Sequence, residues 1–123
     1  MTDSNNIKRV DKPWGYELWW AYTDKYVGKI LHVKKGECLS YQYHAKKDET
    51  IYVLSGKMHL EIEAPGEEKR EADMDTGEAV RITPYTKHRF TAITDCDLLE
   101  ASTPEVDDVV RLEDRYGRAE QEK

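Results

Sequence analysis

Residues 36–56, GECLSYQYHAKKDETIYVLSG, and residues 77–88, GEAVRITPYTKH, place short apolar or alternating runs between glycine and proline turns. Glycine and proline mark turns because of the backbone angles that they adopt. Several short strands at spacings of about 8–12 residues are typical of a β-sandwich or a β-barrel. These two stretches therefore predict an all-β fold.

The rest of the chain repeats this pattern. Residues 58–63, MHLEIE, alternate between apolar and polar side chains, as a half-buried strand does. Helical periodicity is limited to a turn or two near Val106–Leu112. The predicted strands are Lys29–Val33, Cys38–His44, Thr50–Leu54, Met58–Glu63, Ala79–Ile82, Arg89–Ile93 and Leu98–Ser102.

Length and charge narrow the class of protein. The chain has 123 residues, and about 100–200 residues form one domain, so we expect a single domain over residues 1–123. Its net charge of −6 argues against a nucleic-acid-binding protein, which usually carries a basic face. We therefore expect no nucleic acid as a binding partner.

The sequence also indicates a compartment. The longest apolar run, Leu18–Tyr22, is far shorter than the roughly 20 residues of a membrane span. The first ten residues, MTDSNNIKRV, lack the apolar stretch of a signal peptide. Cys38 and Cys96 are too few for a disulfide scaffold and are expected to behave as small buried hydrophobes. We expect a cytoplasmic protein with no membrane partner.

The two ends of the chain differ from its middle. Residues 13–20, PWGYELWW, concentrate three tryptophans and a tyrosine, each of which buries about 150–250 Å². We expect residues 12–22 to form an aromatic arm that lies on the barrel or in a homodimer interface. The polar tail, residues 118–123, is expected to fray.

Four side chains have the chemistry and spacing of a metal site. Gln42 and His44 stand two residues apart on a predicted strand, so they point to the same face. Glu49 begins the next strand, where an antiparallel return would bring it level with them, and His88 arrives from a later segment. An amide oxygen, two imidazoles and a carboxylate suit a divalent transition metal. By spacing alone, a hydrogen-bonded histidine–glutamate pair remains the alternative.

A family resemblance strengthens the metal hypothesis. The chain resembles the two-part cupin motif through the pattern Gly36-x7-His44-x4-Glu49-x6-Gly56 followed by Gly77-x6-Pro84-x3-His88. Gln42 stands where the usual motif has its first histidine, as in mannose-6-phosphate isomerases. The similarity is closest to the carboxy-terminal cupin domain of type II mannose-6-phosphate isomerase/mannose-1-phosphate guanylyltransferase enzymes. It runs from Lys12-Pro13-Trp14-Gly15 to the closing segment 107–118, DDVVRLEDRYGR.

The resemblance implies a fold, a metal and an activity. The fold is a single-domain cupin, a jelly-roll or double-stranded β-helix barrel. The metal would be held by Gln42, His44, Glu49 and His88; we expect zinc first, with manganese, iron, cobalt and nickel as alternatives. The implied reaction is the aldose–ketose isomerisation of a sugar phosphate, with mannose 6-phosphate as the first candidate. Because no glycine-rich phosphate loop precedes the cupin motif, guanylyl transfer is not expected.

The resemblance also suggests roles for residues around the metal. Glu100 matches a family glutamate and is the candidate base, although a strand carboxylate paired with an arginine is the simpler explanation. Arg111 lies in the closing segment and is the first candidate to grip phosphate during catalysis, because arginine can bind phosphate through two parallel hydrogen bonds. Lys29, Lys47 and Arg89 are further candidates for substrate binding. The chain departs from the family at Lys47, where arginine is usual, and at Thr50-Ile51, where histidine and tryptophan are usual.

Two other functions remain open. His44, Glu49 and His88 alone would make the two-histidine, one-carboxylate triad of a non-haem Fe(II) oxygenase. The chain could also be a cupin that binds a metal or a sugar without catalysis, because one fold hosts many functions.

Overall fold

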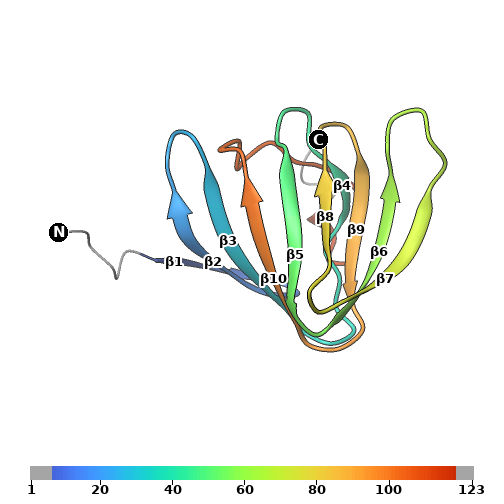
Figure 1. Ribbon diagram of the computed structural model, residues 1–123, viewed down its shortest axis with the longest axis horizontal. Coiled ribbons are helices and arrows are strands. Elements are labelled where there is room, and N and C mark those ends of the chain that lie inside the picture. Colours follow the sequence, from blue (N-terminus) through green and yellow to red (C-terminus); the bar gives the residue numbers. More distant parts are fainter. Residues whose placement is uncertain (1–6, 119–123) are drawn as a thin grey trace.

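The computed structural model describes residues 7–118, which form eleven β-strands in two antiparallel sheets (Figure 1). The first sheet has the strand order β1-β2-β3-β10-β5-β8, with the bounds Lys8–Lys12, Gly15–Tyr22, Val27–Val33, Cys96–Ser102, Glu49–Ser55 and Ala79–Ile82. The second has the order β11-β4-β9-β6-β7, with the bounds Val110–Glu113, Tyr41–Tyr43, Lys87–Ala92, Lys57–Glu63 and Arg70–Asp75. The all-β prediction is confirmed.

The two sheets enclose one core, because alternate side chains of their strands point inward. In β5, Ile51 and Val53 are fully buried, and in β9 Phe90 and Ala92 are buried in the same alternating way. The buried apolar cluster consists of Trp14, Leu31, Val33, Leu39, Ile51, Val53, Met58, Leu60, Ile62, Met74, Ile82, Phe90, Ala92, Cys96 and Leu98. Strands from both sheets contribute to it, so the barrel is held together by apolar burial between the sheets.

Strand register gathers polar side chains at one end of this interior. Buried positions of β10 change from Leu98 to Glu100 and Ser102, and Ser102 pairs in register with Glu49 of β5. On the other side of β10, Glu100 pairs with Lys29 of β3. One end of the barrel is therefore apolar and the other carries buried charges.

The strand predictions hold best where apolar and polar residues alternate. Ala79–Ile82 has the predicted bounds, while the expected strand over Cys38–His44 shortens to β4 and an isolated bridge at Cys38. Four strands were missed, β1, β2, β7 and β11; β7, for example, has only one buried residue. The expected turn or two of helix near Val106–Leu112 was wrong, because a turn and then β11 occupy this segment.

Gly56 of the β5–β6 turn shows why the motif requires glycine. Its φ of 90° is unfavourable for other residues, and a Cβ there would lie 2.2 Å from the carbonyl oxygen of Asp95. The β5–β6 turn can approach the turn that contains Asp95 this closely only because residue 56 has no side chain.

The aromatic segment is a strand, not an arm lying on the barrel. Residues 15–22 form β2, which pairs with both β1 and β3, and Trp14 is buried in the core. Trp20 remains half exposed on the outer face. Of the expected frayed tail, Arg118 is ordered by an ion pair with Asp114, and residues 119–123 lie outside the described part of the chain. No helix among residues 7–118 is long and apolar enough to cross a membrane.

Candidate metal centre

Three predicted ligands meet at the polar end of the barrel. His44 follows β4, Glu49 begins β5 and His88 lies in β9. One potential ligand atom from each lies within 4.8 Å of the other two. Oε2 of Glu49 is 2.9 Å from Nε2 of His44 and 3.8 Å from Nε2 of His88. All three residues are buried, with exposed fractions of 4%, 4% and 1%.

Backbone carbonyl groups set the orientation of both imidazoles. Nδ1 of His88 lies 2.9 Å from the carbonyl oxygen of Thr86, and Nδ1 of His44 contacts the carbonyl oxygen of Asp108. A carbonyl oxygen can only accept a hydrogen bond, so each Nδ1 is the protonated nitrogen. Nε2 is therefore the nitrogen of each ring that faces Glu49 and would bind a metal. This arrangement is typical of histidine ligands, whose second nitrogen is held by a carbonyl or a carboxylate.

The facing atoms lack other partners. Nε2 of His44, Oε2 of Glu49 and Nε2 of His88 are buried side-chain atoms without a hydrogen bond of acceptable geometry. A buried polar atom left unsatisfied costs about 1–3 kcal/mol, and three such atoms converging on one point are hard to explain as packing. A divalent cation would satisfy all three, so the residues present fit a metal.

The charge states also suit metal binding. Burial would raise the pKa of Glu49, but the positive charge of Lys47 and the nearby His44 and His88 lower it to about 2. Burial lowers the pKa of His88, outweighing the attraction of Glu49, and favours the neutral ring. An ionised carboxylate and neutral imidazoles are the forms that bind a metal.

Gln42 lies beside this cluster but is also engaged elsewhere. Gln42 pairs in register with His88. Its side chain lines a cavity that His44 and Glu49 also line. Ser40 Oγ lies 2.6 Å from Gln42 Oε1 and donates a hydrogen bond to it. An amide oxygen has two lone pairs, so this contact leaves one for a metal.

Asp108 orders the loop between His44 and Glu49. Its carboxylate accepts hydrogen bonds from the backbone N–H groups of Ala45, Lys46 and Lys47, at 3.2, 2.6 and 2.9 Å. Burial would raise the pKa of Asp108, but these N–H groups stabilise the charged form and lower it. The same residue therefore holds the loop through its side chain and the ring of His44 through its carbonyl group.

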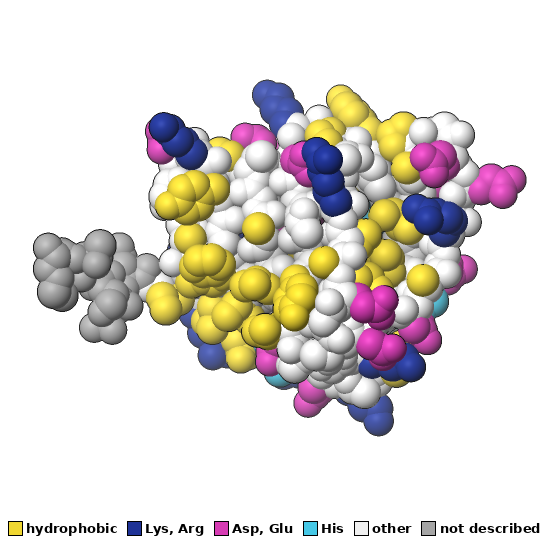
Figure 2. Space-filling model, in the orientation of Figure 1, with side chains coloured by type: hydrophobic (Ala, Val, Ile, Leu, Met, Phe, Trp, Pro, Cys, Tyr) yellow, Lys and Arg dark blue, Asp and Glu magenta, His cyan; other side chains and the backbone are white. Residues whose placement is uncertain are grey.

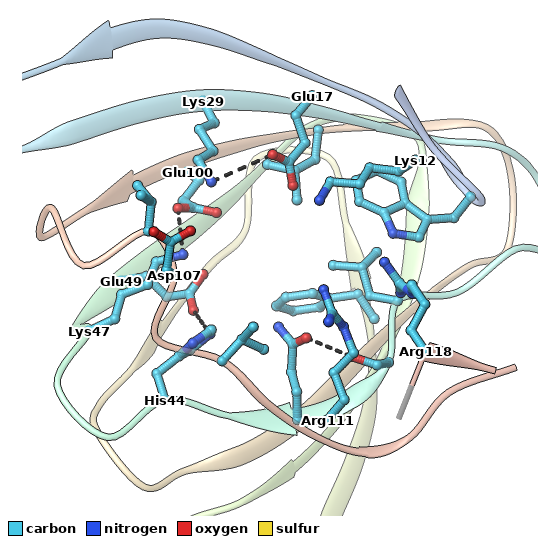
Figure 3. A pocket seen from close by; sticks show the side chains of 18 of the residues that line it. Lys12, Glu17, Lys29, His44, Lys47, Glu49, Glu100, Asp107, Arg111 and Arg118 are labelled. Atoms are coloured by element: carbon cyan, nitrogen blue, oxygen red, sulfur yellow. Dashed lines mark hydrogen bonds and ion pairs between the residues drawn. The ribbon is translucent and has the colours of Figure 1, made fainter. Parts of the chain in front are cut away.

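A cavity of about 380 Å³ is lined by two of the three ligands, His44 and Glu49 (Figure 3). Glu100 lines this cavity, and its partner is a lysine, not the arginine of the alternative explanation. Oε2 of Glu100 is 3.0 Å from Nζ of Lys47 and accepts a hydrogen bond from Ser102 at 2.8 Å. Burial would lower the pKa of Lys47, but Glu100 and Glu49 outweigh it and raise it. Lys47 and Glu100 therefore form a buried charged pair within the cavity.

The predicted substrate residues divide between two places. Lys29, Lys47 and Arg111 line the cavity. Arg89 does not: its guanidinium donates to Glu61 at 2.7 and 3.1 Å and lines a separate surface depression. Arg89 alternates with the inward-facing His88 along β9, so strand geometry turns it away from the site.

Several cavity residues were missed from the sequence. Lys12, Glu17 and Arg118 line the cavity, and Asp108 orders its wall. Glu17 carried a usable signal, because it is the one charged residue within the aromatic run PWGYELWW. No local pattern distinguishes Lys12, Asp108 or Arg118 from surface charges, since only the folded chain brings them to the cavity.

Comparisons with known proteins agree with this geometry. A family model described as a cupin domain matches residues 29–101. The mannose-1-phosphate guanylyltransferase ManC of Salmonella typhimurium is 34% identical over 116 residues, which are 90% of this chain and 23% of the relative. The chain thus spans about a quarter of the length of that relative.

Solved structures show the same fold. KdgF from Halomonas sp. is similar with a TM-score of 0.69 at 22% identity, covering 81% of this chain and 88% of that chain. Oxalate decarboxylase from Bacillus subtilis is similar with a TM-score of 0.79 at 13% identity, covering 90% of this chain and 31% of that chain. At these identities the likeness concerns the fold alone.

Proposed function

The chain belongs to the cupin domain family, and on this premise we propose that it is a metal-dependent isomerase that interconverts an aldose phosphate and its ketose phosphate. The observation that carries the proposal is the convergence of His44, Glu49 and His88 at a cavity that His44, Glu49 and buried Glu100 line. ManC, the relative that is 34% identical, acts in the chemistry of a mannose phosphate by its name. Mannose 6-phosphate is therefore the first substrate to test.

The metal would be held by His44, Glu49 and His88, with Gln42 as a further ligand. A bound divalent cation supplies a Lewis acid that stabilises negative charge on a substrate oxygen. Only Glu49 among these residues carries a negative charge, so the loaded site stays positive. Zinc suits the ligand set, and manganese deserves the next test because Bacillus subtilis oxalate decarboxylase, of the same fold, has Mn(II) centres.

Glu100 is the proposed base. Isomerisation requires removal of a proton from the carbon beside the carbonyl group and its return to the neighbouring carbon. Lys47 and Ser102 both contact Oε2 of Glu100, which fixes the carboxylate and leaves Oε1 as the proton-accepting atom.

Turnover of mannose 6-phosphate to fructose 6-phosphate tests this function. Chelation should abolish activity, and zinc or manganese should restore it. Glu100→Gln should retain the metal and lose about 10²–10⁴-fold in kcat, the usual contribution of a positioned base. Glu71→Gln, an exposed carboxylate of β7, is the matched control and should be unchanged. A fully metal-loaded protein that converts no aldose phosphate would contradict the proposal.

The two histidines and one carboxylate favour one alternative function, that of an Fe(II)-dependent oxygenase. Such a triad also suits Fe(II) and dioxygen chemistry. Oxygen consumption by the iron-loaded protein with a small organic substrate, without isomerisation of sugar phosphates, would establish an oxygenase instead. Binding of metal and sugar phosphate without either reaction would establish a non-catalytic cupin.

A further inference from the structure

The cavity is electrically asymmetric. Figure 3 shows His44, Glu49, Lys47 and Glu100 on one side and Lys12, Arg111 and Arg118 on the other. The first side carries the metal ligands and the buried Lys47–Glu100 pair. The second side gathers three cationic side chains from β1, β11 and the end of the described chain.

Lys12 differs from the other lysines of the cavity. Lys29 is 3.5 Å from Glu17, and Lys47 is 3.0 Å from Glu100. Lys12 makes no ion pair with any residue between 7 and 118, although its side chain is half buried and lines the cavity. A half-buried ammonium without a carboxylate is unfavourable for the free protein.

The surroundings of Lys12 confirm that it is held among cations. Burial lowers its pKa, the attraction of Glu17 opposes this shift, and repulsion by Arg118, Lys29 and Arg111 lowers the pKa further. Glu17 is already engaged by Lys29 and by the indole N–H of Trp19 at 2.8 Å. Glu17 therefore offsets only part of the positive charge on this side.

Arg118 is fixed in place for a ligand. Its Nε and Nη2 donate to the Asp114 carboxylate at 2.8 and 3.1 Å, and the side chain of Asp114 is fully buried. These two bonds hold the guanidinium plane and leave Nη1 as a donor. A pre-positioned guanidinium loses little conformational freedom on binding an anion.

We propose that Lys12, Arg111 and Arg118 form a subsite for the anionic end of the substrate, a phosphoryl group, across the cavity from the metal ligands. The identification of that anion as phosphate rests on the proposed function. Three cationic side chains match a phosphate dianion better than a singly charged carboxylate, and arginine binds phosphate through directed hydrogen bonds. The reacting carbons of the same substrate then lie toward Glu100 and the metal ligands.

Lys12→Met separates this role from a structural one. A lysine that stabilised the fold would lower the melting temperature when replaced. Because the half-buried ammonium of Lys12 loses hydration and gains no ion pair within residues 7–118, we expect Lys12→Met to melt at the same temperature as the natural chain or higher. Arg118→Gln is less informative, since it would leave buried Asp114 without its partner.

The test is calorimetric titration of the full chain with inorganic phosphate, both metal-loaded and chelated. Lys12→Met should weaken binding about tenfold, as expected for loss of one charge-assisted hydrogen bond. Lys57→Met, which removes the same charge from β6 outside the cavity, should bind as the natural chain does. Unchanged affinity in Lys12→Met, or phosphate binding that requires the metal, would overturn the subsite.

Kinetics separate failure of the subsite from failure of the proposed isomerase. For an active enzyme, Lys12→Met should raise KM for the aldose phosphate by about tenfold, with a smaller effect on kcat. Isomerisation with an unchanged KM in Lys12→Met would contradict the subsite alone. Phosphate binding that depends on Lys12, without turnover of any aldose phosphate, would contradict the isomerase alone.

Discussion

The candidate metal centre depends on individual contacts that lie behind the ligands. Thr86 and Asp108 accept hydrogen bonds from the two imidazoles, and Ser40 donates to the amide oxygen of Gln42. These contacts determine which atoms face the metal, so the ligand types alone do not define the site. Two substitutions test the ligands and their supports separately.

His88→Ala should remove nearly all of the bound metal. The substitution deletes one imidazole ligand and leaves Glu49 with His44 alone. Metal content after chelation and reloading, measured by elemental analysis, gives the result, and a retained β-sheet circular dichroism spectrum shows that the barrel persists. His59→Ala, a partly exposed histidine of β6, is the control and should keep its metal. Full metal retention in His88→Ala would show that the ligand assignment is wrong.

Asp108→Ala should weaken both the fold and metal binding. It removes the acceptor of three backbone N–H groups, with an expected loss of about 1–3 kcal/mol in the free energy of unfolding. Because that loop carries His44, metal affinity should fall about 10–100-fold. Urea unfolding and metal titration measure the two effects. Asp107→Ala, the exposed neighbour, should leave the unfolding free energy unchanged; an equal loss there would refute the role of Asp108.

The strands differ in how strongly the fold holds them. β10 is central, pairs with β3 and β5 and carries both apolar core residues and Glu100. β7 is an edge strand, nearly all exposed, and pairs only with β6. The pairing of β7 therefore depends more on its side-chain contacts with β6 than on packing against the core.

His59 makes the pairing of β7 sensitive to pH. Its two ring nitrogens lie 2.8 Å from Asp73 and 2.9 Å from Glu71, and these carboxylates raise the pKa of His59 above its ordinary value of 6.5. The stabilisation is therefore fully present below about pH 6.5 and is lost as pH rises through the raised pKa. The difference in unfolding free energy between the natural chain and His59→Gln should be larger at pH 5.5 than at pH 8.5. An equal difference at both pH values would contradict this prediction.

The outer face of the first sheet has an apolar row that crosses four strands. Register places Leu18, Ile30, Leu99 and Tyr52 side by side in β2, β3, β10 and β5. Trp20, Tyr22 and Tyr26 add exposed aromatic surface nearby, and Figure 2 shows hydrophobic side chains gathered on this face. Continuous apolar surface of this kind marks an interaction site.

We propose that this face joins two copies of the chain. A two-fold axis would place the same row on both partners, which is the common geometry of homodimers. Light scattering at micromolar concentration should give twice the chain mass of 14.4 kDa. Tyr52→Lys should shift the protein toward the monomer, whereas Ile93→Lys, an exposed apolar residue outside this row, should not. A single species of 14.4 kDa in the natural chain would contradict the dimer.

Local features of the sequence were enough to predict much of this molecule. Alternation and turn residues predicted the all-β fold and most strands, because the period of two and the glycine turns are properties of neighbouring residues. The spacing around His44, Glu49 and His88 indicated which residues could share a metal. β7 was not predicted, because its mostly exposed residues do not show a clear alternation of apolar and polar side chains.

The folded chain determined the rest, because it depends on register between strands that are distant in sequence. Pairing of β10 with β3 and β5 set Glu100 beside Lys47 and Lys29, while alternation along β9 turned Arg89 outward. Lys12 and Arg118, from opposite ends of the chain, meet at one cavity that no local pattern foretells. A sequence specifies chemical groups and local periods, whereas distances between groups follow from pairing and packing of the whole barrel.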